Sequence, residues 1–118
     1  MKVLLCGAEI DLNINMTDAA EVEKLEKKVD NLVEQLSEIE MQRGKKFSQI
    51  ICEEVQCTSN WLDEHLGEGI GEHILKDRTD LKDVYGIIYT MKSLHRIYMD
   101  QIVKEALADY TAERAQRK

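Results

Sequence analysis

The start of the chain alternates apolar and polar positions in the way that is typical of a β-hairpin. If Cys6-Gly7 forms a two-residue turn, Val3 faces Ile10 on an apolar face, and Lys2 faces Asp11 on the opposite, polar face. An isolated two-stranded hairpin is only marginally stable. We therefore expect the apolar face to lie on helices or on the sheet of another chain.

The next segment changes to helical spacing. Asp18 is a predicted N-cap, and Glu21 completes the sequence pattern of a capping box. A parallel homodimeric coiled coil would place Glu21 against Glu26, so packing within the domain or an antiparallel arrangement is favoured. The apolar positions, spaced alternately by three and four, are Val22, Leu25, Val29, Leu32, Leu36 and Ile39.

A second helix follows, and glycines end it. Gly67 and Gly69 stop the helical pattern, which resumes as a short turn over 70–75 before a polar connector. The residues predicted to be buried by this second helix are Phe47, Ile50, Ile51, Val55, Thr58, Trp61 and Leu62.

The last helix is predicted to be very long. Thr79 or Asp80 caps it, and its apolar stripe reaches Tyr110. At about 1.5 Å per residue it would measure roughly 54 Å, whereas a compact domain of this size is roughly 35 Å across. The helix must therefore kink, project or pack on another subunit, and an uncovered stripe favours a homo-oligomer or a bound partner.

The fold class is mainly α: an N-terminal β-hairpin followed by three to four helices, with a long C-terminal amphipathic helix. The 118 residues contain no proline, which fits long helices, and are enough for a single domain over 1–118. The predicted elements are the hairpin at 1–16, an acidic helix at 18–43, a helix at 45–66, a glycine-containing turn with a short helix at 67–79, and a long helix at 80–116.

Composition excludes several classes of function. The formal net charge of −7 disfavours binding to nucleic acid. There is no apolar run long enough to cross a membrane, and the N-terminus lacks the features of a signal peptide. With three cysteines, an odd number, we expect a soluble cytoplasmic protein with reduced thiols.

No pattern in the sequence predicts catalysis. Cys52 and Cys57 are five residues apart, and on a helix this places them roughly 140° apart, which does not suit a zinc site with His65 and His73. The glycine turn is surrounded by glutamates and follows a helix, unlike a phosphate-binding loop. We therefore expect no catalytic residues, no metal and no cofactor, and the protein is not expected to be an enzyme.

Trp61, the only tryptophan, has two interpretations. It is either a core residue or the hot spot of a protein-binding groove beside the glycine break. In the second interpretation the groove lies between the glycine break and the last helix. Its binding residues are Trp61, Leu62, Leu66, Ile70, Tyr98 and Ile102.

The order of these features resembles a group of small proteins encoded in the tail-gene cassettes of tailed phages and prophages of Gram-positive bacteria. The matching residues are the hairpin, the segment Trp61-Leu-Asp-Glu-His-Leu-Gly-Glu-Gly69, Ile74-Leu75 and the segment 81–91. The chain departs from them at Lys76-Asp-Arg, where relatives often carry a glycine pair, and in its extended C-terminal tail. The resemblance implies a non-enzymatic tail assembly factor in the cytoplasm of the bacterial host, similar to the chaperones that bind the tail tape-measure protein.

Two alternatives remain. One is a structural homo-oligomer, such as a head-tail or tail accessory component, that extends a sheet through the hairpin edge. The other, a helix-turn-helix regulator, requires a basic recognition helix. Residues 70–92 have no basic excess, which makes the regulator the least favoured alternative. The basic side chains there are Lys76, Arg78, Lys82 and Lys92, and the acidic ones are Glu72, Asp77, Asp80 and Asp83.

Overall fold

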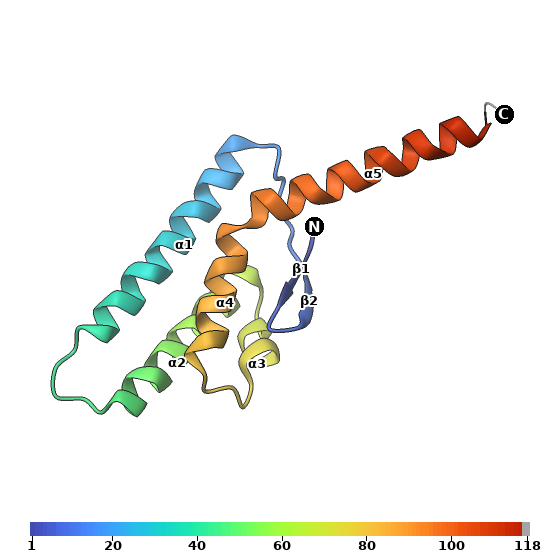
Figure 1. Ribbon diagram of the computed structural model, residues 1–118. Helices are drawn as coiled ribbons and strands as arrows, with labels where there is room; N and C mark the ends of the chain where they lie inside the picture. Colours follow the sequence, from blue (N-terminus) through green and yellow to red (C-terminus); the bar gives the residue numbers. More distant parts are fainter. Residues whose placement is uncertain (117–118) are drawn as a thin grey trace.

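A computed structural model describes residues 1–116 and shows a helical protein with one N-terminal hairpin (Figure 1). The mainly α fold class is confirmed. In the described residues there is one helix more than the three to four expected, because the long terminal helix is divided. The elements are β1 (Lys2–Leu5), β2 (Ala8–Asp11), α1 (Ala19–Glu40), α2 (Phe47–Leu66), α3 (Ile70–Leu75), α4 (Leu81–Lys92) and α5 (Leu94–Gln116).

The hairpin has the predicted register. β1 and β2 are antiparallel, with Val3 opposite Ile10 and Lys2 opposite Asp11. Cys6 and Gly7 both have positive φ, 50° and 82°, which is the conformation of a type I′ turn. The Arg78 guanidinium donates to the Cys6 carbonyl oxygen at 3.1 Å and so ties this turn to the start of α4.

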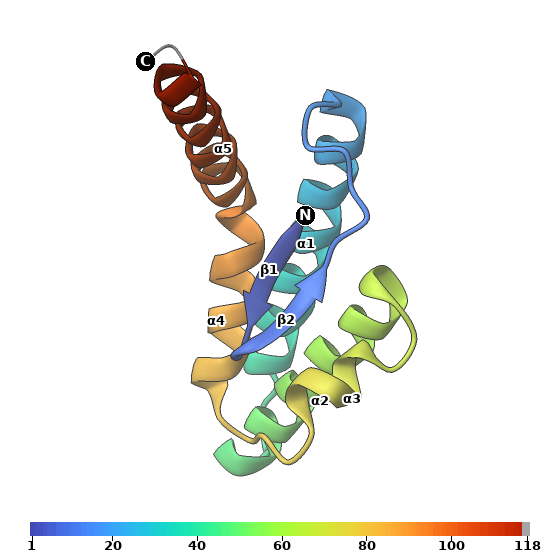
Figure 2. The same cartoon turned by 90° about the vertical axis from the view of Figure 1, so that its right-hand side faces the viewer.

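The core lies where four parts of the chain meet, namely α1, α2, α4 and the apolar face of the hairpin. α1 and α2 pack side by side, and α4 lies against both of them and against β1 (Figures 1 and 2). Fully buried members from four elements are Leu5, Leu32, Leu62, Val84 and Ile87. Asp18 and Asp80 are the N-caps of α1 and α4, and each side chain accepts a backbone N–H two residues later at 2.9 Å.

Two expectations from the second helix are corrected. α2 begins at Phe47, two residues later than predicted, and the Phe47 side chain is 69% exposed instead of buried. Phe47 is the first residue of α2, and this end of α2 follows directly on the loop that leaves α1 after Glu40 (Figure 1). α1 likewise ends three residues before the expected Arg43.

The glycine turn holds α3 very close to α2. Gly67 and Gly69 have positive φ, and the Gly71 N–H donates to Asp63 Oδ1 at 2.7 Å. A Cβ at Gly71 would lie 2.2 Å from the Ser59 carbonyl oxygen, so only glycine permits this approach.

The terminal helix breaks at Ser93. Ser93 has φ −98° and ψ 8°, and its N–H is shared between the carbonyl oxygens of Tyr89 and Thr90. Serine has a side chain that competes for backbone hydrogen bonds, and such residues are common at helix bends. α5 therefore leaves α4 in a new direction and projects from the body (Figures 1 and 2).

Candidate functional site

Trp61 is a core residue that joins α2 to α1. Its side chain is 4% exposed, and Nε1 donates to the Lys28 carbonyl oxygen at 2.9 Å. The ring also meets His65 edge-on, with 5.1 Å between ring centroids. Leu62 beside it is fully buried. Neither side chain is available to a partner while the core is closed.

The six binding residues predicted from the sequence are not brought to one surface. Leu66 and Ile70 are half-buried against the core near Trp61, whereas Tyr98 is half-buried and Ile102 exposed on α5. Figure 2 shows the α2–α3 unit and α5 at opposite ends of the molecule. The break at Ser93 turns the terminal helix away, so a groove shared by Trp61 and the residues of α5 does not form.

An apolar groove lies instead between the first half of α1 and the junction of α4 with α5. We call it the α1–α5 groove, and it has a volume of about 540 Å³. Its apolar lining consists of Met16, Val22, Leu25, Val29, Met91 and Leu94. Val29, Met91 and Leu94 are buried at its floor, and Met16, Val22 and Leu25 are half-buried along its wall.

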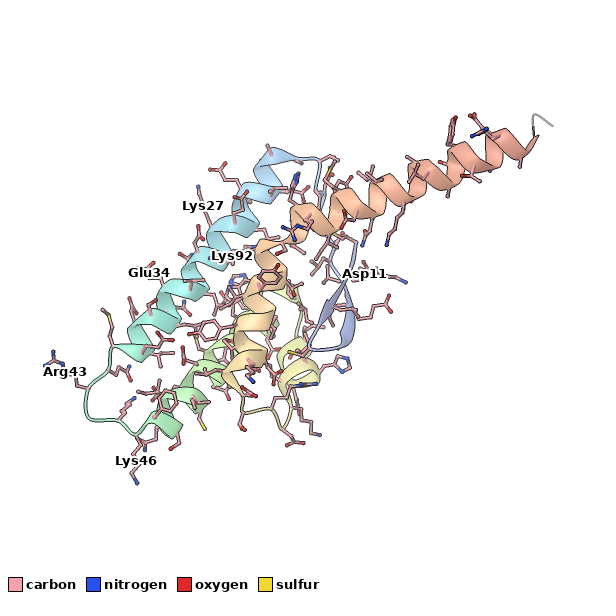
Figure 3. The ribbon with its side chains drawn as sticks, in the orientation of Figure 1. Asp11, Lys27, Glu34, Arg43, Lys46 and Lys92 are labelled. Carbon is pink, nitrogen blue, oxygen red and sulfur yellow. The ribbon has the colours of Figure 1, made fainter. Side chains whose placement is uncertain are left out.

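Charged side chains surround this apolar lining. Glu26 and Asp30 come from α1, and Lys92 and His95 from the α4–α5 junction. Lys92 is labelled at that junction in Figure 3, where Lys27 and Glu34 project from the side of α1 turned away from α4. The groove thus has an apolar floor, an acidic edge on α1 and a basic edge at the α4–α5 junction, an arrangement suited to an apolar segment that carries charges of both signs, one sign on each side.

The sequence held a partial signal for this groove. The α1 seam has six apolar positions, but only Val29, Leu32 and Leu36 are buried. Val22 and Leu25 extend the seam past the elements that cover it, because α5 bends away at Ser93. The residues of α1 could be recognised as a seam, but the opposite wall depends on where the terminal helix breaks.

A second apolar surface runs along the projecting part of α5. We call it the α5 stripe, and it consists of Met99, Ile102, Val103, Ala106, Leu107 and Tyr110. Its side chains are exposed, reaching 60% for Leu107. Arg114 lies over the Tyr110 ring at 5.9 Å. The spacing of three and four places the stripe on one side of the helix.

The α5 stripe is not a continuation of the stripe on α4. Leu94, Ile97 and Gln101 face the body, and the Gln101 side chain donates to the Lys2 carbonyl oxygen at 3.2 Å. At about 100° per residue, the α5 stripe is centred roughly 180° around the helix from that side. The expectation of one apolar face from 81 to 110 is therefore wrong, because the apolar positions change side after Tyr98.

Buried titratable groups lie elsewhere, where α1, α2 and α4 meet. Glu54 is completely buried and its carboxylate oxygens have no hydrogen-bond partner within the described residues. Burial, and after it the interaction with the neighbouring carboxyl group of Glu40, raises the pKa of Glu54 to about 7. The Tyr85 hydroxyl donates to Glu40, which lowers the pKa of Glu40 and raises that of Tyr85 to about 12.

These groups do not form a recognisable catalytic set. Glu40, Glu54 and Tyr85 include no nucleophile with a base and an oxyanion donor. Burial raises the pKa of the thiols of Cys6 and Cys57, which makes both less reactive. Over residues 1–116 no group of three or more histidine, cysteine, aspartate or glutamate side chains is placed to hold a metal ion. No helix in this range is long and apolar enough to span a membrane.

The chain belongs to a family of unknown function, DUF6673, whose family model matches residues 7–118. No curated protein and no solved structure matches it.

Proposed function

We propose that this member of the DUF6673 family is a non-enzymatic assembly factor that binds an apolar helical segment of another protein in the α1–α5 groove. The observation that carries the proposal is the groove itself, with an apolar lining from two sides and a volume of about 540 Å³. Helical partners commonly place their apolar face in such grooves.

The charges around the groove favour one kind of partner helix. Residues 18–40 contain eight acidic side chains against three lysines, and Glu26 and Asp30 are at the groove itself. A helix whose apolar stripe has lysine or arginine on the side that faces α1, and acidic side chains on the side that faces Lys92 and His95, would match the floor and both edges. The acidic surface also keeps a protein with exposed apolar side chains in solution.

The resemblance to small proteins of tail-gene cassettes suggests the source of this helix. In this proposal the partner is a phage or prophage tail protein such as the tape-measure protein, and the chain acts as a cytoplasmic chaperone before the tail forms. An apolar face on such a partner helix would require cover until assembly, because large exposed apolar patches favour aggregation.

The test is co-expression with a tape-measure protein from the same locus. Wild-type protein should increase the soluble yield of the partner. The double change Glu26→Lys/Asp30→Lys should reduce that increase, because it reverses the charge beside the groove.

The matched control is Glu34→Lys/Glu38→Lys, which alters the net charge equally on exposed positions of α1 that do not line the groove. Its effect should equal that of wild type. If both double variants act alike, the groove is not the binding site. If the wild-type protein does not change the partner's solubility, the chaperone proposal fails.

A structural homo-oligomer, such as a head-tail or tail accessory component, is the second candidate. One observation favours it, namely the exposed α5 stripe, an apolar surface that another subunit could cover. A structural component of this kind should form rings or polymers by electron microscopy, whereas an assembly factor should remain a small defined species.

A further inference from the structure

The α5 stripe has an internal symmetry. Its six positions are symmetric about the midpoint between Lys104 and Glu105: Met99 corresponds to Tyr110, Ile102 to Leu107, and Val103 to Ala106. A twofold axis through that midpoint would place two antiparallel copies of α5 with these residues at the same level. Such a contact is isologous, since the same surface serves on both subunits.

The charges at the two ends of the stripe follow the same symmetry. Arg96 corresponds to Glu113, since each lies three residues beyond an end of the apolar stripe. Both lie within roughly 60° of the centre of the stripe, at about 100° per residue. An antiparallel pair therefore sets Arg96 of each copy at the level of Glu113 of the other, with opposite charges at both ends.

The body of the protein leaves this side of α5 free. The hairpin and α4 contact α5 through Leu94, Ile97 and Gln101, on nearly the opposite side of the helix. Figures 1 and 2 show α5 clear of every other element beyond its first turns. The α5 helix of a second copy can therefore lie along the stripe without meeting the body of the first copy.

We propose that the α5 stripe binds the α5 stripe of a second copy of this chain in an antiparallel, twofold-symmetric pair. Ala106 beside Val103 of the other copy allows close approach at the centre, and Met99 packs against Tyr110 on either side. The arrangement covers the exposed apolar side chains of both α5 stripes and leaves both α1–α5 grooves outside the contact between the stripes.

A parallel pair is disfavoured by the same residues. It would place Arg96 against Arg96 and Glu113 against Glu113 of the other copy, which are contacts between like charges. In the parallel pair Asp109 of one copy would lie near Arg114 of the other, which is a favourable contact, but these two residues lie farther from the centre of the interface. Orientation is therefore the sharpest property to test.

Disulfide cross-linking in the full-length protein distinguishes the two orientations. The variants are Met99→Cys and Tyr110→Cys, each with Cys52→Ser to remove the exposed native thiol. In the antiparallel pair, two Cys at position 99 are roughly 16 Å apart along the axis, too far for a disulfide, which needs about 6 Å between Cα atoms. Each variant alone should stay uncross-linked on mild oxidation, and an equal mixture should form a cross-linked dimer.

Cross-linking of each variant with itself, and not of the mixture, would overturn the antiparallel arrangement. Absence of any cross-link together with a monomeric mass would overturn the pairing altogether. Cys52→Ser alone is the control for linkage through Cys6 or Cys57.

Charge exchange gives an independent test. Arg96→Glu should raise the dissociation constant of the dimer about tenfold, the change that corresponds to roughly 1.4 kcal/mol, because both end pairs become repulsive. The double variant Arg96→Glu/Glu113→Arg should restore the wild-type value. Failure of the second change to rescue the first would contradict the pairing of these residues.

The apolar contact is tested by two adjacent substitutions measured in sedimentation experiments. Leu107→Asp places a charge in the stripe and should give a monomer. Ala108→Asp places the same charge on the opposite side of α5 and should leave the dimer intact. Circular dichroism shows whether both variants keep their helices, and equal dissociation by both would overturn the assignment of the stripe.

Discussion

Glu54 is the residue whose chemistry is most altered by the fold. It is completely buried between α1, α2 and α4, and Glu40, Tyr85 and Cys57 are the titratable groups that interact with it. Its pKa of about 7 lies above the ordinary value of 4.5. The folded state therefore holds its proton more tightly than the unfolded state does.

The sign of the pH dependence follows from this shift. The contribution of Glu54 to the free energy of unfolding should be fully present below about pH 4.5 and should be lost as the pH rises through about 7. Its size should be on the order of 2 kcal/mol. Glu40 has a lowered pKa and acts in the opposite direction, but at pH values below 4.5.

Glu54→Gln should therefore flatten the stability profile between pH 5 and pH 8 and raise stability at pH 8, on the order of 2 kcal/mol. Urea denaturation at several pH values measures this effect. The exposed Glu34→Gln is the control and should keep the wild-type slope. A profile for Glu54→Gln as steep as that of the wild type would show that another group is responsible.

Gly71 and Gly86 form a second matched pair at this scale. A Cβ at Gly71 would overlap the Ser59 carbonyl oxygen, whereas Gly86 in α4 has open space around it. Gly71→Ala should lower the free energy of unfolding by about 2 kcal/mol through overpacking of α3 on α2. Gly86→Ala should raise it by about 0.5–1 kcal/mol, because alanine favours the helix. Equal effects in chemical denaturation would contradict the tight α2–α3 contact.

At the scale of elements, sequence was informative where local rules decide. The hairpin register is confirmed because one turn position brought together apolar pairs on one face and Lys2 with Asp11 on the other. The cap Asp18 is confirmed for a similar reason, and of the two candidates for the last helix, Thr79 and Asp80, the structure has Asp80 as the cap. These signals depend on neighbouring residues only.

The errors came from tertiary context. Phe47 has the spacing of a core residue, but α1 ends before it can cover that position. The sequence left two interpretations of Trp61 open, and the packing of α1 on α2 places this side chain in the core. The break at Ser93 has no proline or glycine to mark it, so the division of the last helix and the groove beside it were missed. The change of apolar side after Tyr98 could have been found by following the helical phase.

Hydrogen exchange tests whether α5 has a partner in solution. A single helix with an exposed stripe is held by few tertiary contacts, so its amides beyond Gln101 should exchange rapidly in a monomer. Pairing should slow their exchange as the protein concentration rises, while the amides of α2 change little. Rapid exchange in α5 at every concentration would mean that the stripe remains uncovered.

The whole molecule is more extended than its size requires. Its radius of gyration is 18.0 Å and its extents are 71 × 30 × 22 Å. A compact domain of this length has a radius of gyration of about 13 Å. The difference arises from α5, which bends at Ser93 and projects, two of the outcomes that its length predicted.

The central claim is that this projecting helix is an interface, and sedimentation of the full-length protein over a wide concentration range tests it most directly. The account predicts a dimeric mass at high concentration and a shift to monomer when the chain is truncated after Ile97. A full-length protein that stays strictly monomeric at the highest concentration would contradict it.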